Sequence, residues 1–454
     1  MLSGILTFLL LTAGCNTMNY STQYTSISHI NQKIYSHAKH LPDYDSPYTI
    51  CYQNTDKTYS MYLFSAPVQY WTEQGYRLID NELVSASKKG YAYENKANSI
   101  KTYFPASLQQ SFRIEREKDY LKFYILENEN KFSNAQRMKY TNQYGDIVSA
   151  VYYSGNTKDI VLYPTRAGIK TEIILKTAVE TISFSIKFSG TCYENKHNGY
   201  LLLKDNNGIV GLIQQPLVQY QEGGKKKLDL KTEINVEKEG DTYRVDMTLG
   251  NSLWSDGNEE SSVTLDPSFE LYLNKIPDSS VYSNYTVNSY LRSYAVIGEH
   301  SMLGQGKEYV RFRLNSLLMM PKENLISAEY YVRMLSFQEP EDIYMERVGE
   351  QWSSQNIIWQ SRPVTKEEIA RVDESKTNDC RFDISEFVRN CFDDPTWSTE
   401  SYGVVISSGR MAQSCILATA DNALYPPYTV LTLSKLPNYF EPHENINPIK
   451  KGKI

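Results

Sequence analysis

The sequence predicts an all-β protein built from β-sandwiches, and three observations lead to this prediction. Apolar and polar residues alternate in several runs, among them Ile182–Phe188 and Tyr243–Leu249, which is the pattern of strands with one face in a core. Turn signals such as Asn206-Asn207-Gly208 separate the runs. Tyrosine, which favours strands, occurs 37 times. Many short strands at regular spacing are typical of sandwiches.

The length and charge of the chain narrow the class of protein. A chain of 454 residues is long enough for more than one domain, and 41% hydrophobic with 22% charged residues is ordinary for a folded protein. The net charge of −6 gives no general attraction to nucleic acid or to an anionic membrane. We therefore expect no nucleic-acid partner.

The first 15 residues have the pattern of an export signal. A short apolar run, Ile5–Leu11, precedes Thr12-Ala13-Gly14-Cys15 and is too short to span a membrane. Small residues directly before a cysteine resemble the lipobox of bacterial lipoproteins. The pattern thus predicts a lipoprotein at the cell surface, anchored to the membrane through a lipid on Cys15. An ordinary cleaved secretion signal and a buried first strand are the alternatives.

The rest of the chain divides by composition. Residues 16–45 are polar and are expected to form a spacer, and residues 46–268 are expected to form a β-rich N-terminal region of sandwich type. A boundary is expected near Leu265-Asp266-Pro267, because Asp-Pro interrupts regular structure. Residues 278–436 then form a second β domain, and the polar tail 437–454 is expected to be disordered.

Helix signals are few. The segment Asp383-Ile384-Ser385-Glu386 can form a capping box, and the residues after it place one apolar face on a short helix: Ile384, Phe387, Val388 and Cys391. A further turn or two of helix is expected over Lys366–Val372. Neither segment is long enough to define an α/β layer.

The cysteines give no framework of disulfides. Besides Cys15 there are five, widely spaced, and none forms a CxxC pair, so zinc binding is not expected. The five are Cys51, Cys192, Cys380, Cys391 and Cys415, and we expect most of them to be small buried apolar residues. One disulfide is the alternative, and the sequence does not indicate which two cysteines would form it.

Residues 278–436 carry an ordered set of short motifs: Tyr309–Leu314, Ile326–Val332, Trp352, Ile358–Pro363, Phe382–Ser385 and Tyr402–Ile406. This order resembles the DNRLRE domain, a jelly-roll β-sandwich related to carbohydrate-binding module family 96. The resemblance implies a C-terminal jelly roll that binds polysaccharide. Upstream, Phe64–Tyr70, Gly75–Asn81 and Val263–Pro267 resemble the leader of bacterial cell-surface proteins that carry such domains, often ahead of RHS repeats.

A candidate binding patch follows from strand alternation in this second domain. If Val310, Phe312 and Leu314 face the core, their neighbours face outward, and a second strand over Ala328–Met334 presents its own outward set. Were the two strands paired, the patch would contain Tyr309, Arg311, Arg313, Tyr331 and Arg333. Such a patch suits an acidic sugar polymer, since aromatic rings pack on sugar faces and guanidinium groups bind carboxylates. A solvated sheet face with ordinary cross-strand pairs is the alternative.

One loop offers two further candidates. Trp397 follows Asp393-Asp394-Pro395, and an exposed tryptophan there could stack on a sugar. Asp393 and Asp394 could help to hold a structural Ca²⁺, which needs several oxygen ligands. No other cofactor is expected.

No motif for catalysis was found. The sequence has no G-x-S-x-G elbow, P-loop or G-x-G-x-x-G, and His197 is the only histidine of residues 46–268. We therefore expect a non-catalytic surface protein that binds polysaccharide. A purely structural envelope module is the first alternative, and a polysaccharide lyase or hydrolase with an appended binding module is the second.

Overall fold

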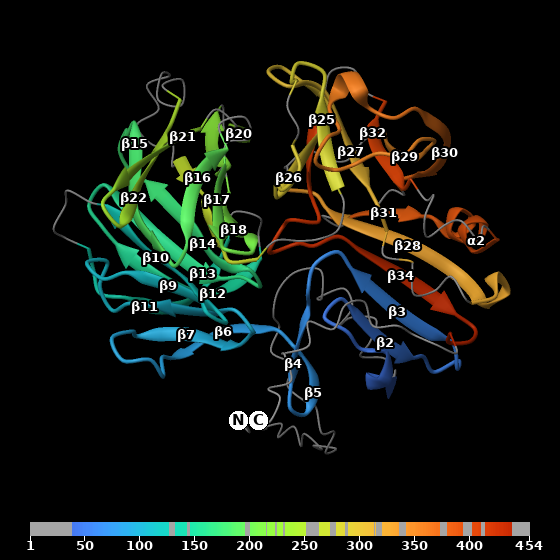
Figure 1. Cartoon of the computed structure of the whole chain (residues 1–454), viewed down its shortest axis with the longest axis horizontal. Coiled ribbons are helices and arrows are strands. Elements are labelled where there is room, and N and C mark those ends of the chain that lie inside the picture. The colour runs from blue at the N-terminus through green and yellow to red at the C-terminus, as the bar shows by residue number, and fades with distance from the viewer. Residues whose placement is uncertain are drawn as a thin grey trace, which may run out of the picture.

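The chain folds into two lobes made almost entirely of antiparallel β-sheets, as the sequence predicts (Figure 1). The N-lobe comprises residues 80–272, and the C-lobe combines residues 39–64 with residues 278–437. The computed structural model describes residues 39–126, 132–142, 146–195, 200–214, 216–222, 225–229, 232–250, 263–272, 278–286, 289–312, 314, 320–335, 342–372, 379–393, 402–409 and 414–437.

Two sheets form the N-lobe. The eight-stranded sheet has the order β21 (Glu233–Glu239), β22 (Thr242–Thr248), β15 (Thr181–Phe188), β10 (Asp119–Leu126), β9 (Phe112–Arg116), β8 (Lys101–Phe104), β7 (Tyr93–Ala97), β6 (Asp80–Ser85). The eleven-stranded sheet has the order β11 (Gln136–Thr141), β12 (Ile147–Ser154), β13 (Lys158–Pro164), β14 (Gly168–Leu175), β24 (Ser268–Glu270), β18 (Gly208–Ile213), β17 (Tyr200–Asp205), β16 (Thr191–Asn195), joined by β19 (Val218–Glu222), β20 (Lys225–Asp229) and β23 (Val263–Leu265).

The core of the N-lobe lies between these two sheets. Strand β15 buries Ile182, Phe184, Ile186 and Phe188 and leaves the alternate residues at the other face, as its period of two predicts. Phe123 of the eight-stranded sheet stacks on Phe269 of the eleven-stranded sheet, with 3.9 Å between ring centroids. One continuous apolar cluster therefore joins both layers.

The C-lobe is a second pair of sheets. The seven-stranded sheet has the order β30 (Thr365–Arg371), β29 (Ile343–Val348), β32 (Val404–Ser408), β27 (Gly304–Val310), β26 (Tyr294–His300), β33 (Ser414–Ala418), with β25 (Asp278–Tyr282) beside β27. The six-stranded sheet has the order β1 (Lys39–His40), β2 (Thr49–Gln53), β3 (Tyr59–Phe64), β34 (Tyr428–Leu433), β28 (Leu325–Arg333), β31 (Asp379–Asp383). Within the described ranges of the C-lobe, 3₁₀ turns lie at Pro42–Tyr44, Lys322–Asn324 and Trp359–Ser361.

The expected division of the chain at residue 46 is wrong in one respect. Strands β2 and β3 pair with each other, and β3 pairs along its whole length with β34, the last strand, from Tyr59↔Leu433 to Phe64↔Tyr428. Part of the expected spacer also belongs to this sheet, because β1 pairs with β2. In Figure 1 the blue β2 and β3 lie beside the red β34. Strand pairing over such a sequence separation leaves no local signal.

The core of the C-lobe lies between the seven-stranded and six-stranded sheets. Met61 and Leu63 of β3 pack there with residues from the distant half of the chain, including Leu431 and Phe382. Of the five cysteines expected to be buried, all are buried and none is paired in a disulfide. Burial raises the pKa of the Cys51 thiol to about 12, so it is unreactive at neutral pH.

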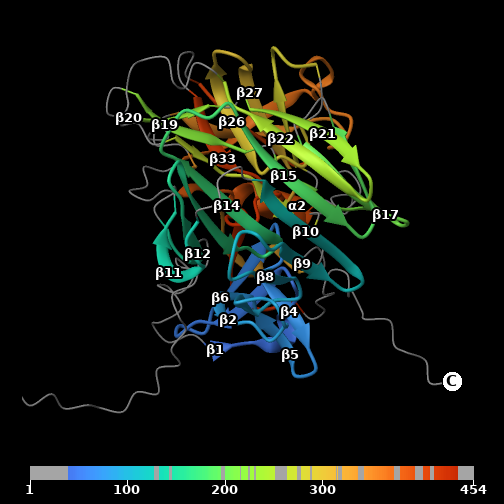
Figure 2. The ribbon, with the colours of Figure 1, turned by 90° about the vertical axis from the view of Figure 1, so that its left-hand side faces the viewer.

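The lobes meet through a third apolar cluster, which we call the seam. Val161 and Tyr163 of β13 pack there against Val296 of β26 and Ile416 of β33. Strands β26 and β33 therefore serve two cores, since their alternate residues Ala295 and Leu417 belong to the C-lobe core. Figure 1 shows the two lobes side by side, and in Figure 2, which views the molecule from the N-lobe side, β26 and β33 lie behind the strands of the N-lobe.

The predicted short helix is confirmed, and the second helical segment is wrong. Helix α2 spans Ser385–Asp393, and Ile384, Phe387, Val388 and Cys391 are all buried. The carboxylate of Asp383 accepts a hydrogen bond from the Ser385 backbone amide at 3.0 Å. It thus gives a partner to one of the amide groups that the first turn of a helix leaves without one. The segment Lys366–Val372, expected to be helical, instead contributes to strand β30, because it pairs with β29.

A hairpin outside the four sheets completes the fold. Strands β4 (Gln69–Thr72) and β5 (Gly75–Leu78) pair only with each other and project at the bottom of the molecule in Figure 1. Its base is tied to the C-lobe, since the Gln69 amide donates to the carbonyl oxygens of Ser46 and Thr49. Among the residues that the structure describes, no helix is long and apolar enough to cross a membrane.

Candidate functional site

The structure does not assemble the patch that strand alternation predicted. Strand β27, which carries Tyr309, belongs to the seven-stranded sheet, whereas β28, which carries Tyr331 and Arg333, belongs to the six-stranded sheet. The two strands face each other across the C-lobe core instead of pairing. Alternation identifies the two faces of a strand, but it does not identify the strand's neighbour.

The prediction that Tyr309 and Arg311 face outward on a binding patch is also wrong. Tyr309 is fully buried, with its ring 5.6 Å from that of Trp352, because a segment after β29 covers this face of the sheet. Arg311 lies just beyond the end of β27, where its guanidinium packs over Trp352 and donates to the Trp352 carbonyl oxygen at 2.6 Å. Both residues therefore have a structural role in the C-lobe.

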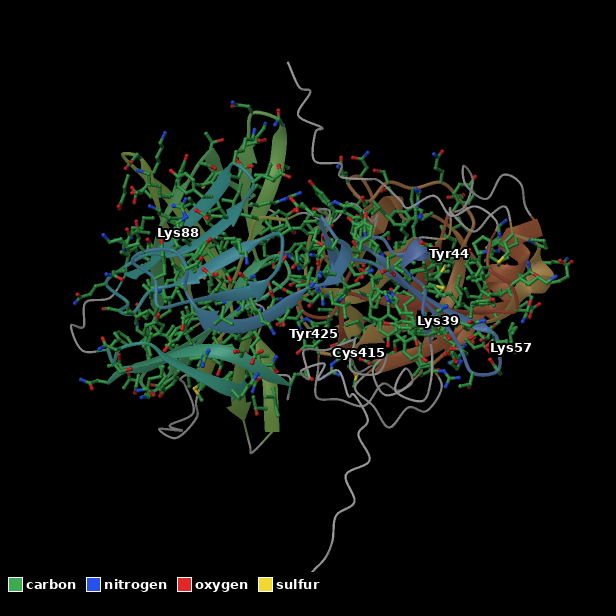
Figure 3. All side chains as sticks on the ribbon, turned by 90° about the horizontal axis from the view of Figure 1, so that it is seen from below. Lys39, Tyr44, Lys57, Lys88, Cys415 and Tyr425 are labelled. Atoms are coloured by element: carbon green, nitrogen blue, oxygen red, sulfur yellow. The ribbon has the colours of Figure 1, made fainter. Side chains whose placement is uncertain are left out.

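Arg333 does not face an open surface either, because it forms ion pairs within the molecule. Its guanidinium lies 3.1 Å from the carboxylate of Asp146, which belongs to the N-lobe, and 3.6 Å from that of Asp379 on β31. It also packs over the ring of Tyr425, whose hydroxyl donates to Asp146 at 2.6 Å. Figure 3 labels Tyr425 where the two lobes meet. Arg333 thus joins the lobes at the edge of the seam.

Replacing Arg333 with methionine is expected to lower the free energy of unfolding by about 3 kcal/mol, because two carboxylates in a mostly buried network lose their cation. Urea unfolding of the full chain measures this loss. The matched control is Arg347→Met, since Arg347 forms an exposed ion pair with Glu367 and its loss should cost less than about 1 kcal/mol. Equal losses in both variants would contradict a joining role for Arg333.

Several predicted residues lie outside the described part of the chain. These are Arg313, Trp397, Asp394 and the lipidation residue Cys15. Asp393 ends helix α2, but its side chain is likewise not described. In the described chain, no group of three or more His, Cys, Asp or Glu side chains is arranged to hold a metal ion. The calcium site stays a prediction.

Of the predicted residues whose side chains the structure describes, Tyr331 alone lies on an outer surface of a sheet with other aromatic rings. It is half-buried on the outer side of the six-stranded sheet, opposite to the C-lobe core. There it joins a group of aromatic side chains that come from four strands and from the β4–β5 hairpin. We call this surface the aromatic face. Its buried layer consists of Tyr62, Phe64 and Tyr428, and its half-buried or exposed rings are Tyr52, Tyr331, Trp71 and Tyr76.

The strand register brings these rings into contact. Phe64, Tyr428 and Tyr331 lie on neighbouring strands in one cross-strand row, because Phe64 pairs with Tyr428 and Tyr428 pairs with Tyr331. The rings of Tyr331 and Tyr428 stack 4.9 Å apart at an angle of 6°. Two residues before Phe64 on the same strand, the Tyr62 ring contacts the Tyr52 ring edge to face, with 6.2 Å between ring centroids. Cross-strand aromatic pairs of this kind stabilise a sheet as well as offer a surface.

The hairpin extends the face toward solvent. Leu78 and Val68 pack on the aromatic rings of the sheet. The rings of Trp71 and Tyr76 contact each other edge to face, with 5.0 Å between their centroids. Trp71 is 56% exposed, the most exposed large aromatic side chain in the described chain. A large apolar ring left in water is unusual enough to suggest a partner.

A histidine and a carboxylate connect the hairpin with the sheet. The His40 ring lies 5.3 Å from the ring of Tyr52 and shares a 3.0 Å hydrogen bond with the buried carboxylate of Asp45. Burial, and then the charge of Asp45, raise the pKa of Tyr76 on the hairpin. Asp45 therefore orients His40 over the sheet.

At the opposite side of the face, one carboxylate organises the polar groups. Glu329 accepts a hydrogen bond from the Tyr331 hydroxyl at 2.7 Å and lies 2.8 Å from the guanidinium of Arg381. Burial, and then the Glu329 charge, raise the pKa of Tyr62 to about 12. These tyrosines consequently stay neutral at physiological pH and can act as hydrogen-bond donors.

Sequence reasoning missed every residue of the aromatic face except Tyr331. Tyr52 and Tyr62 lie in the region assigned to the N-terminal domain, far from Tyr331 in sequence. A signal was present in both strands, since residues 50–52 and 61–64 are apolar or aromatic at every position. Such continuous runs indicate strands covered on both faces.

Comparison of the sequence with models of known protein families finds no match, and comparison with curated proteins finds no similar sequence. The likeness of residues 278–436 to the DNRLRE domain therefore stays a prediction.

Proposed function

We propose that this protein is a non-catalytic cell-surface protein that binds polysaccharide on its aromatic face. The observation that carries the proposal is the exposed Trp71, at 56%, together with the half-buried rings of Tyr52, Tyr76 and Tyr331, on the outer side of the six-stranded sheet and its hairpin. A sugar ring presents an apolar face of C–H groups, and an aromatic ring covers it while the surrounding hydroxyls meet polar groups. The half-buried Tyr52, Tyr76 and Tyr331 offer a long sugar chain further contacts of this kind, while the buried rings beneath them support the sheet.

The polar groups of the face fit this use. Sugar hydroxyls both donate and accept hydrogen bonds, and the face offers the Glu329 and Asp383 carboxylates, the Arg381 guanidinium and the His40 ring. The export pattern at Cys15 supports a location at the cell surface, with the lipid anchor as part of the same proposal. A purely structural module needs no exposed tryptophan at this place.

Replacing Trp71 with alanine is expected to weaken glycan binding about tenfold, because one exposed aromatic anchor is lost. The stability should change little, since Trp71 is mostly exposed. A glycan array identifies a ligand for the full chain, and calorimetric titration then measures its dissociation constant. The matched control is Tyr124→Ala, a half-buried strand tyrosine on the eight-stranded sheet, which should leave binding unchanged. Absence of binding to every glycan on the array would favour the structural module instead.

A further inference from the structure

The charges on the aromatic face are already paired with one another. Glu329 of β28 and Asp383 of β31 lie directly opposite each other on the outer side of the sheet, and Arg381 lies two residues before Asp383 on the same strand. The Arg381 guanidinium is 2.8 Å from Glu329. Burial acts to raise the pKa of Asp383, but the hydrogen bonds from Ser385, and then the charges of Arg381 and Arg389, hold it below its ordinary value. Arg381 is thus paired with Glu329 and lies near a second carboxylate.

The other cations near the face also have partners, and Arg389 of α2, whose charge acts on Asp383, donates to the Ile326 carbonyl oxygen. His40 is bound to Asp45, and Arg333 is bound to Asp146 and Asp379 at the seam. Arg311, once expected to bind uronate carboxylates, lies against Trp352 in the other sheet of the C-lobe. An acidic sugar would therefore meet carboxylates before it met an unoccupied arginine on this face.

We propose that the aromatic face selects uncharged polysaccharides and rejects uronate polymers, and that Glu329 is the residue that sets this choice. The inference rests on the proposed function, since it concerns the ligand of the same face. Bringing a uronate carboxylate beside Glu329 and Asp383 brings like charges together and displaces the partner of Arg381. A neutral sugar meets no such repulsion and can donate its hydroxyl hydrogens to both carboxylates. Selection by an unfavourable contact of this kind is a common basis of specificity.

Calorimetric titration of the full chain with two sets of oligosaccharides tests the proposal. The neutral set contains cello-, xylo- and manno-oligosaccharides, and the acidic set contains oligogalacturonate and alginate oligosaccharides. We expect the chain to bind at least one neutral probe. Its affinity for every acidic probe should be at least about tenfold lower than for that neutral probe. The affinity for the neutral probe should not change between about 50 mM and 500 mM NaCl, because no ligand charge is screened.

The variant Glu329→Gln keeps the shape of the side chain and releases Arg381 from its charge. We expect it to gain about tenfold in affinity for the acidic probes, since a guanidinium becomes able to bind a carboxylate. The matched control is Glu367→Gln, which releases Arg347 from an equivalent pair on the seven-stranded sheet and should gain nothing.

The outcomes separate the two proposals. Tight binding of an acidic probe by the wild-type chain, abolished by Trp71→Ala, would overturn the selection of uncharged sugars and keep the aromatic face as the binding site. Binding of no probe from either set would overturn the proposed function itself. Should Glu329→Gln fail to fold, the comparison of neutral with acidic probes on the wild-type chain still decides.

Discussion

Replacing Glu308 with glutamine is expected to stabilise the protein at about pH 8 by several kcal/mol, and to have much less effect at about pH 5. Glu308 is buried with two other carboxyl groups inside the C-lobe, next to the seam. Asp278 and Asp421 share a hydrogen bond, and the Asp278 carboxylate also accepts one from the Ala420 amide at 2.6 Å. One oxygen of Glu308 accepts from Ser280 at 2.5 Å, and the other has no partner.

The pH dependence follows from the pKa values of this group. Burial raises the pKa of Asp278 to about 7, and burial together with the neighbouring carboxylates raises those of Glu308 and Asp421 well above their ordinary values. In the unfolded chain the same groups ionise near pH 4. Between about pH 4 and pH 7 the folded protein therefore holds more protons, and its free energy of unfolding falls as the pH rises.

Urea unfolding at about pH 5 and pH 8 measures both effects. The wild-type protein should lose stability over this interval, and Glu308→Gln should lose less, because the amide cannot ionise. The control is Glu233→Gln, an exposed residue of β21, which should follow the wild type. If Glu308→Gln and the wild type lost stability in parallel, Glu308 would not hold a proton in the folded state.

The C-terminal half of the chain is expected not to fold on its own. A fragment of residues 278–437 lacks β2 and β3, so it exposes one edge of β34 and uncovers the part of the core that Cys51, Met61 and Leu63 fill. An unpaired central edge and an open core together cost more than the stability of an ordinary domain, about 5–15 kcal/mol. A fragment of residues 80–272 keeps both of its sheets and should fold.

Circular dichroism and cooperative thermal unfolding of the purified fragments measure this difference. Residues 39–79, fused through a short linker after Pro437, should restore folding, because the Tyr44 hydroxyl lies 3.5 Å from the Pro437 carbonyl oxygen. A cooperative transition in residues 278–437 without that addition would show that β2 and β3 are dispensable for the C-lobe.

The class of fold was predictable because it depends on local pattern. Ile182–Phe188 alternates with a period of two and forms β15, and the capping signal at Asp383 precedes α2. The assembly of strands into sheets was not predictable, because it depends on pairing between distant segments. The membership of Tyr59–Phe64 in the last sheet is the clearest case.

The residues of the candidate site were harder still to predict than the sheets, because their exposure depends on distant segments. Tyr331 was identified because its strand has two distinct faces, but Tyr309 was assigned to solvent although another segment covers it. Covering segments and neighbouring strands come from the tertiary fold, which one sequence without relatives does not reveal. The prediction that Arg333 offers its charge to a ligand was wrong for the same reason, since its carboxylate partners lie in the other lobe and on β31.

The pairing of β3 with β34 also determines the order in which the molecule can be completed. A ribosome releases β3 early, yet the strand that must lie beside it is among the last to be made. All strands of the N-lobe emerge in between and can pair among themselves first. Closing so long a loop is slow, and until it happens the β2–β3 pair lacks the neighbour that β34 provides along β3. The C-lobe should therefore form only after synthesis is complete, so that a product truncated before β34 lacks the aromatic face.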